Sequence, residues 1–177
     1  MTMVFVSTKP TLPRWLCEKI LIGHLPWQQS LCQSYSDFNH VYTLHDSYLL
    51  GTYQSAETYG ETVLCFLWDT LWLPEAASCQ VKQNEPLFLL IKVTKTLGIV
   101  LSEGTLPKPD KQPRRILKAE HVEVDDQTVL VIDDTQQNTL TVVFSGQLHF
   151  LAMDSEQRLI NLDIESASSP KDIFLGA

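Results

Sequence analysis

The sequence predicts an α+β protein in which an N-terminal helical hairpin packs on a mostly antiparallel β meander of about nine or ten strands. Apolar residues recur at helical spacing before residue 36 and alternate with a period of two residues after it. In the second part of the chain, turn-forming residues separate the apolar runs every eight to ten residues. We expect the meander to close into a barrel or to fold into two packed sheets.

The helical hairpin is expected over residues 11–36. The first helix occupies 13–22, follows Thr11 as a capping residue, and stops at Gly23, because glycine readily ends a helix. A proline at position 26 favours the beginning of a second helix. The apolar side chains that define one face of this second helix are Trp27, Leu31 and Tyr35.

Short β-branched and aromatic runs predict the strands, after one short strand that precedes the hairpin. The run from Leu87 to Ile91 is apolar on both faces, so we expect both faces to be covered, one of them by the helices. The strands expected in the first half are 39–45, 48–54, 61–68, 86–93 and 97–102. Those expected in the second half are 119–124, 128–132, 139–145, 147–153 and 158–164.

The length of 177 residues is consistent with one domain followed by a tail. We expect a single domain over residues 1–165 and a flexible C-terminal tail over 166–177. The domain is then divided into the hairpin (11–36), a first set of strands (37–105), a basic proline-rich loop (106–118) and an acidic meander (119–165).

The charge distribution restricts the classes of partner. The chain has 13 basic and 21 acidic residues, a net charge of −8, which argues against a surface built to bind nucleic acid. Residues 101–118 contain five basic and two acidic residues, whereas residues 119–177 contain two basic and eleven acidic ones. We therefore expect another protein chain as the partner, in a hetero- or homo-oligomer, and nucleic acid only locally through the 108–118 loop.

The basic loop has two interpretations. It is either a flexible hook for an acidic partner, RNA or a nuclear import receptor, or a solvated loop that the acidic sheet partly neutralises. Its candidate partner-binding residues are Lys108, Lys111, Arg114, Arg115 and Lys118.

The turns of the acidic meander also have two interpretations. In an up-and-down sheet alternate turns emerge at the same end, so four carboxylates would gather into a site for Ca²⁺ or for a basic partner. Alternatively, aspartate is present there because it favours turns that face water. The four residues are Asp133, Asp134, Asp154 and Glu156.

The histidines provide the polar groups for an alternative function. A strand, two helices and a long meander resemble, in element order alone, the small ligand-binding β-barrels of the fatty-acid-binding type. That resemblance implies a barrel with an internal cavity that binds, or acts on, a mostly apolar molecule. The candidate ligand-contacting residues are His40, His45, His121 and His149.

No local motif of catalysis, metal binding or nucleotide binding occurs: the sequence has no G-x-x-x-x-G-K-S/T, G-x-G-x-x-G, G-x-S-x-G, C-x-x-C or H-E-x-x-H. We expect no cofactor and no metal. The first expectation for function is a non-enzymatic protein-binding or assembly subunit of an intracellular complex, although scattered residues can build an enzyme site without a motif. The chain begins without a secretory signal, and no apolar run is long enough to span a membrane, so its four cysteines suggest a cytoplasmic or nuclear location.

Overall fold

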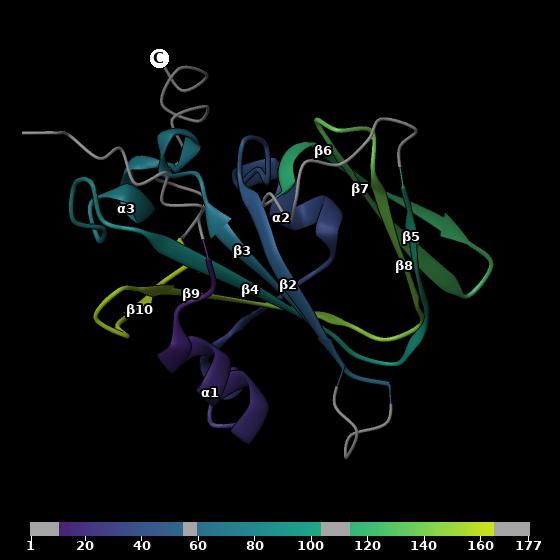
Figure 1. Cartoon of the computed structure of the whole chain (residues 1–177), viewed down its shortest axis with the longest axis horizontal. Helices are drawn as coiled ribbons and strands as arrows, with labels where there is room; N and C mark the ends of the chain where they lie inside the picture. Colours follow the sequence, from purple (N-terminus) through teal and green to yellow (C-terminus); the bar gives the residue numbers. More distant parts are fainter. Residues whose placement is uncertain (1–10, 55–59, 104–113, 165–177) are drawn as a thin grey trace, which may run out of the picture.

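The computed structural model describes residues 11–54, 60–103 and 114–164. It contains one ten-stranded, mostly antiparallel sheet that does not close into a barrel (Figure 1). The first five strands are β1 (Leu31–Cys32), β2 (Tyr48–Gln54), β3 (Thr62–Trp68), β4 (Leu87–Val93) and β5 (Thr96–Ser102). The others are β6 (Arg114–Val124), β7 (Gln127–Asp134), β8 (Thr139–Phe144), β9 (Leu148–Asp154) and β10 (Leu159–Ile160).

Three short α-helices and two 3₁₀ turns accompany the sheet within the described ranges. They are α1 (Arg14–Ile22), η1 (Trp27–Gln29), α2 (Tyr35–Val41), η2 (Thr70–Trp72) and α3 (Glu75–Ser78). In the described part of the chain, no helix has the length and apolar character needed to cross a membrane.

The sheet has two parts, which we call the first and second half-sheets. The order of its strands is β1-β9-β4-β3-β2-β6-β7-β8-β5, with β10 beside β9. The first half-sheet runs from β1 to β2, and the second runs from β6 to β5. Among the described residues, the sheet is continuous between them through two β2–β6 residue pairs, Tyr48 with Arg115 and Leu49 with Arg114. The two half-sheets can therefore face each other across a shared core (Figure 1).

Helix α2 fills the space between the half-sheets. Its fully buried Phe38 stacks on Phe150 of β9 with ring centroids 4.0 Å apart, and it also contacts Tyr42 and Trp68. Helix α1 covers the opposite face of the first half-sheet, where its buried Leu16 joins a second apolar cluster. Both faces of the apolar strand β4 are therefore covered, as its sequence predicts, but by helices on opposite sides.

The predicted helical hairpin is only loosely confirmed. Helix α1 lies where expected and ends at Gly23, whose φ of 78° is left-handed. The second expected helix is replaced by η1 and β1, and α2 begins later, at Tyr35, inside the expected hairpin; it then continues into the segment 39–45 expected to be a strand. The reason is a helix cap at Ser34, whose hydroxyl accepts a hydrogen bond from the N–H of Asp37 at 3.1 Å.

The expected meander is wrong at its centre, because β8 and β9 do not pair with each other. Strand β8 pairs with β5 in the second half-sheet, and β9 pairs with β4 in the first. The β4–β5 and β8–β9 connections thus pass side by side from one half-sheet to the other. At this corner Thr94 N–H donates to Gln147 O at 3.0 Å, and Ser145 N–H donates to Lys95 O at 3.0 Å.

The remaining differences concern closure and the ends of elements. The strands of the described residues do not close into the barrel implied by the resemblance to fatty-acid-binding proteins, because their order is open from β1 to β5. Strand β6 begins at Arg114, so the last part of the predicted 106–118 loop is a strand, and the expected strand over 158–164 shortens to β10. The expected N-terminal strand, most of the basic loop and the tail lie outside the described residues.

Candidate functional site

The outer face of the second half-sheet is apolar. Side chains alternate along a β-strand, so every second residue of β7 and β8 points into the core and the residues between them lie on the outer face. The strand register aligns Val122, Val129, Val143 and Gly98 in one row, and Glu120, Val131, Thr141 and Val100 in the next. We call the surface formed by these valines the valine face; its residues are Val100, Val122, Val129, Val131 and Val143.

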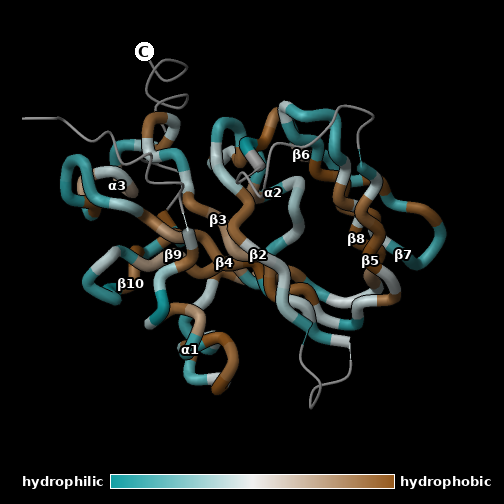
Figure 2. Tube along the Cα trace, viewed as in Figure 1, coloured by the Kyte–Doolittle hydropathy of each residue, from teal (hydrophilic) through white to brown (hydrophobic). Residues whose placement is uncertain are grey.

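The valine face is open to solvent at its margins. Val100 is 57 % exposed and Val122 is 50 % exposed, while the valines between them are half-buried. Figure 2 shows apolar colour along β5 and β8 in this region. Neither α1 nor α2 covers this face, since both have their buried contacts elsewhere.

Carboxylates border the valine face along β6 and at the β6–β7 turn. Glu120 lies in one of its rows and is exposed, and the turn beyond it contains exposed Asp125 and Asp126. Lys118 is a nearby cation. Its Nζ lies 3.3 Å from Oε1 of Glu120 and 3.9 Å from Oδ2 of Asp133. The border of the apolar surface is therefore predominantly negative.

A second feature combines Arg115 with the neighbouring residues His45 and Asp46, which lie far from it in the sequence. Arg115 donates to the Asp46 carboxylate from Nη2 at 2.8 Å and from Nε at 3.0 Å. Nδ1 of His45 donates to the carbonyl oxygen of Leu117 at 2.8 Å, and its Nε2 lies 3.5 Å from Asp46. The backbone of Asp46, with φ of 65°, also pairs with Ile116, so the turn before β2 is fixed to the beginning of β6.

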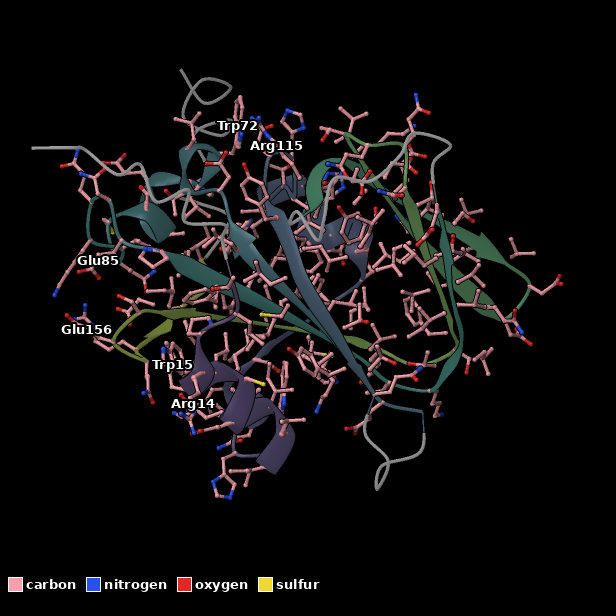
Figure 3. The ribbon with its side chains drawn as sticks, in the orientation of Figure 1. Arg14, Trp15, Trp72, Glu85, Arg115 and Glu156 are labelled. Atoms are coloured by element: carbon pink, nitrogen blue, oxygen red, sulfur yellow. The ribbon has the colours of Figure 1, made fainter. Side chains whose placement is uncertain are left out.

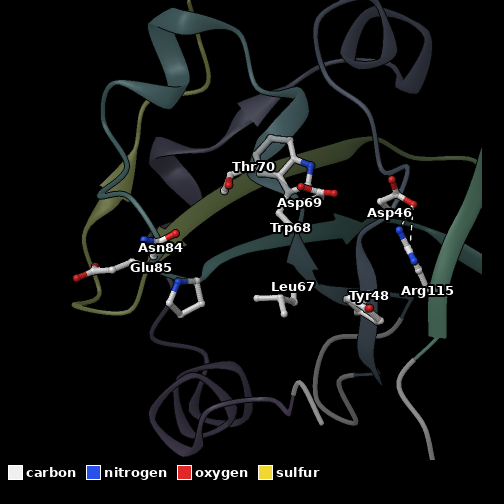
Figure 4. A pocket seen from close by; sticks show the side chains of 10 residues that line it. Asp46, Tyr48, Leu67, Trp68, Asp69, Thr70, Asn84, Glu85 and Arg115 are labelled. Carbon is white, nitrogen blue, oxygen red and sulfur yellow. Dashed lines mark hydrogen bonds and ion pairs between the residues drawn. The ribbon is translucent and has the colours of Figure 1, made fainter. Parts of the chain in front are cut away.

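A surface pocket of about 500 Å³ lies beside this ion pair. Figure 4 shows Asp46 and Arg115 at one side of it and Glu85 at the other, with Asp69 between them. Each charged group already has a partner, because Asp69 accepts from the N–H of Leu71 and Glu85 accepts from the Ser155 hydroxyl. The polar groups of the pocket, which Leu67, Trp68 and Pro86 also line, are thus oriented by the protein itself.

An exposed apolar turn, η2, lies next to the ion pair. Trp72 is 50 % exposed and its ring is 6.0 Å from that of His45. Figure 3 shows Trp72 and Arg115 at the same edge of the molecule. Tryptophan and arginine are enriched at the energetic centres of protein interfaces, so this edge is a second surface suited to contact another chain.

The structure places only part of the predicted basic loop. Lys108 and Lys111 lie outside the described residues, and Arg114 lies at the beginning of β6. Arg115 and Lys118 are both paired with carboxylates, Arg115 with Asp46 and Lys118 with Glu120 and Asp133. The charges of these two residues are therefore partly neutralised by neighbouring carboxylates in the structure.

The acidic turns do not come together. Asp133 and Asp134 lie at the end of β7 in the second half-sheet, whereas Asp154 ends β9 and Glu156 lies in the turn from β9 to β10 in the first (Figure 1). Both buried aspartates organise their own turn instead. Asp134 accepts from the N–H groups of Gln136 and Asn138, in the same pattern that Asp154 makes with its own turn.

Asp154 is 2 % exposed, and its charge is stabilised by its turn. Burial alone would raise the pKa of its carboxyl, but hydrogen bonds from the backbone and guanidinium of Arg158 and from Glu156 N–H outweigh burial and lower it. A lowered pKa in the folded state stabilises the fold above the unfolded pKa, and this stabilisation is lost as the pH falls through the folded value.

We expect Asp154→Asn to lower the free energy of unfolding by about 1–3 kcal/mol near pH 7, because it removes the charge that its hydrogen bonds stabilise. The difference from wild type should shrink below about pH 4, as the wild-type carboxyl becomes protonated. Urea unfolding at several pH values measures both effects. Glu156→Gln, a change on the same turn at a half-exposed carboxylate, is the control and should have a clearly smaller effect. A pH-independent difference for Asp154→Asn would contradict the assignment.

The four candidate histidines have different surroundings. His40 is exposed on α2, and His45 belongs to the Asp46–Arg115 cluster. His121 on β6 lies against Tyr35. Burial raises the pKa of Tyr35 to about 12. Burial, with nearby Lys92, lowers the pKa of His149, whose Nδ1 is 3.3 Å from the Ser30 hydroxyl. The structure does not bring them to one internal site.

Comparison with protein families, with curated proteins and with solved structures finds no significant match. The functional interpretation therefore depends on the geometry of the chain itself.

The valine face was missed from the sequence, although a signal for it exists. Alternation along the expected strand 139–145 predicts one buried face, formed by Leu140, Val142 and Phe144. The alternate positions Val129, Val131 and Val143 are also apolar. A second apolar face in strands that have a helix on only one side indicates a surface that another element covers.

Proposed function

We propose that the chain is a non-enzymatic protein-binding subunit, and that it docks a partner protein on the valine face. The supporting observation is the layer arrangement of the molecule. Both faces of the first half-sheet and the inner face of the second pack against apolar clusters, whereas the described residues leave the valine face open. An apolar sheet face is stable in water only when small or when covered.

The border of the face suggests the chemistry of the partner. Glu120 lies beside it on β6, and Asp125 and Asp126 lie in the β6–β7 turn, so a partner element with an apolar surface and a flanking Lys or Arg complements it. The small-ligand alternative has less support. The space that a ligand would occupy inside a barrel is filled by Phe38, Tyr42 and the residues on which they pack.

We expect Val122→Lys to reduce binding of the partner about tenfold or more, because it places a cation in an apolar contact and repels a basic flank. The full tagged chain is immobilised and incubated with extract of the source cells, and quantitative mass spectrometry compares the captured proteins. Leu21→Lys is the matched control, since Leu21 is 71 % exposed on α1, which covers the other half-sheet.

A supporting result is a protein that wild type and Leu21→Lys retain equally, that Val122→Lys loses, and that is released by raised salt. The proposal fails if every captured protein is retained by Val122→Lys, or if both variants lose the same proteins. Circular dichroism of both variants verifies that the lysines leave the fold intact.

A further inference from the structure

Strand β5 forms one end of the sheet. Within the described residues its only strand partner is β8, so the opposite backbone edge is left without a ladder. The N–H of Thr96 is an exception, because it donates to the carbonyl oxygen of Gly60 at 2.6 Å. The open edge therefore begins after Thr96 and continues to Ser102.

This edge lacks the features that usually prevent strands of different molecules from pairing. The segment from Thr96 to Ser102 contains neither a charged residue nor a proline. Leu97, Val100 and Leu101 are 56 %, 57 % and 42 % exposed. A bulge at Leu97 disturbs the register only at the beginning of the strand. The opposite end of the sheet is different, since β1 has only two residues.

The residues on the two sides of Ile99 match those of an antiparallel second copy: apolar residues lie at equal distances from Ile99, and a basic residue at one end corresponds to an acidic residue at the other. Lys95 precedes the strand and Glu103 follows it. In an antiparallel pair of two copies centred on Ile99, Leu97 lies opposite Leu101 of the second copy, and Gly98 lies opposite Val100. The same pairing puts Lys95 near Glu103 of the second copy at both ends. A parallel pair would instead bring like charges together.

We propose that β5 pairs with β5 of a second copy of this chain, in an antiparallel arrangement with two-fold symmetry over residues 97–101. Such an interface is isologous, because the same strand contributes to both sides. The two-fold axis is perpendicular to the sheet, so the valine faces of both copies lie on the same side and form one continuous surface. The dimer does not depend on the proposed partner, but it would present two docking faces to it.

The experiment is sedimentation velocity of the full chain over a wide range of micromolar concentrations. We expect a reversible monomer–dimer equilibrium in wild type. Leu101→Lys should weaken the dimer about tenfold or more, because each copy would insert a cation opposite Leu97. Val122→Lys is the control and should leave the dimer unchanged, which separates this interface from the docking face.

A charge exchange tests the predicted register. Lys95→Glu alone and Glu103→Lys alone should each weaken self-association, since each variant puts like charges near one another at both ends of the interface. An equimolar mixture of the two variants should form a heterodimer, because both pairs then become attractive. Two results would overturn the proposal: a chain that stays monomeric throughout, or a dimer that neither Leu101→Lys nor the charge exchange alters.

Discussion

Replacing Phe38 with alanine is expected to lower the free energy of unfolding by about 3–5 kcal/mol, because it leaves a cavity at the centre of the core. Phe38 is fully buried, and its ring is stacked on Phe150 at 4.0 Å and on Tyr42 at 5.1 Å between centroids. Together with Tyr35, it attaches α2 to the core between the two half-sheets. Urea unfolding followed by tryptophan fluorescence measures the loss.

The control is Val41→Ala on the same helix. Val41 is 37 % exposed, so its truncation should cost less than about 1 kcal/mol. Phe38→Leu retains much of the volume and should have an intermediate effect, which keeps the test informative if the alanine variant does not fold. A loss below about 1 kcal/mol for Phe38→Ala would show that α2 is not part of the core.

Gly146→Ala is expected to destabilise the protein by about 3 kcal/mol, because a methyl group has no room at the corner between the half-sheets. A Cβ added at Gly146 would lie 2.3 Å from Thr94 Oγ1 and 2.4 Å from Thr94 O. Part of the obstruction is backbone, so rotation of a side chain cannot relieve it. The change would also separate Gln147 N–H from Thr94 Oγ1, to which it donates at 2.7 Å.

Gly98→Ala is the matched control for this prediction. A Cβ at Gly98 meets no atom within 4 Å, so we expect a change of less than about 0.5 kcal/mol. Thermal unfolding at a low protein concentration compares both variants with wild type. If Gly146→Ala unfolds at the same temperature as Gly98→Ala, then the two connections do not pack as the structure places them.

Local sequence patterns predicted the strands well where alternation and turn residues coincided. The strands 48–54, 61–68, 86–93 and 97–102 are close to β2, β3, β4 and β5. The segment 39–45 failed, because the cap at Ser34 favours a helix that begins earlier and includes its first residues. The cap, together with the burial of Tyr35 and Phe38 on this helix, thus outweighed a short β-branched and aromatic run.

The candidate sites show the same limit. The sequence contains His45, Asp46 and Arg115 as polar residues, but no pattern indicates that β6 begins beside the turn before β2. The expected cluster of four acidic residues required β8 and β9 to be neighbours. Since each pairs with a different strand, the turns at their far ends lie in different half-sheets.

The sequence by itself determined the mostly antiparallel composition of the domain, the two-sided apolar character of β4, and the acidic second half. These properties depend on residues close in the chain, and side-chain period and turn chemistry encode them directly. Only the tertiary structure decided that the chain turns a corner at Gly146, that α2 enters the core, and that the described residues leave the valine face open. Those outcomes depend on which distant strands pair, and many pairings satisfy the same local pattern, so packing of the whole core selects among them.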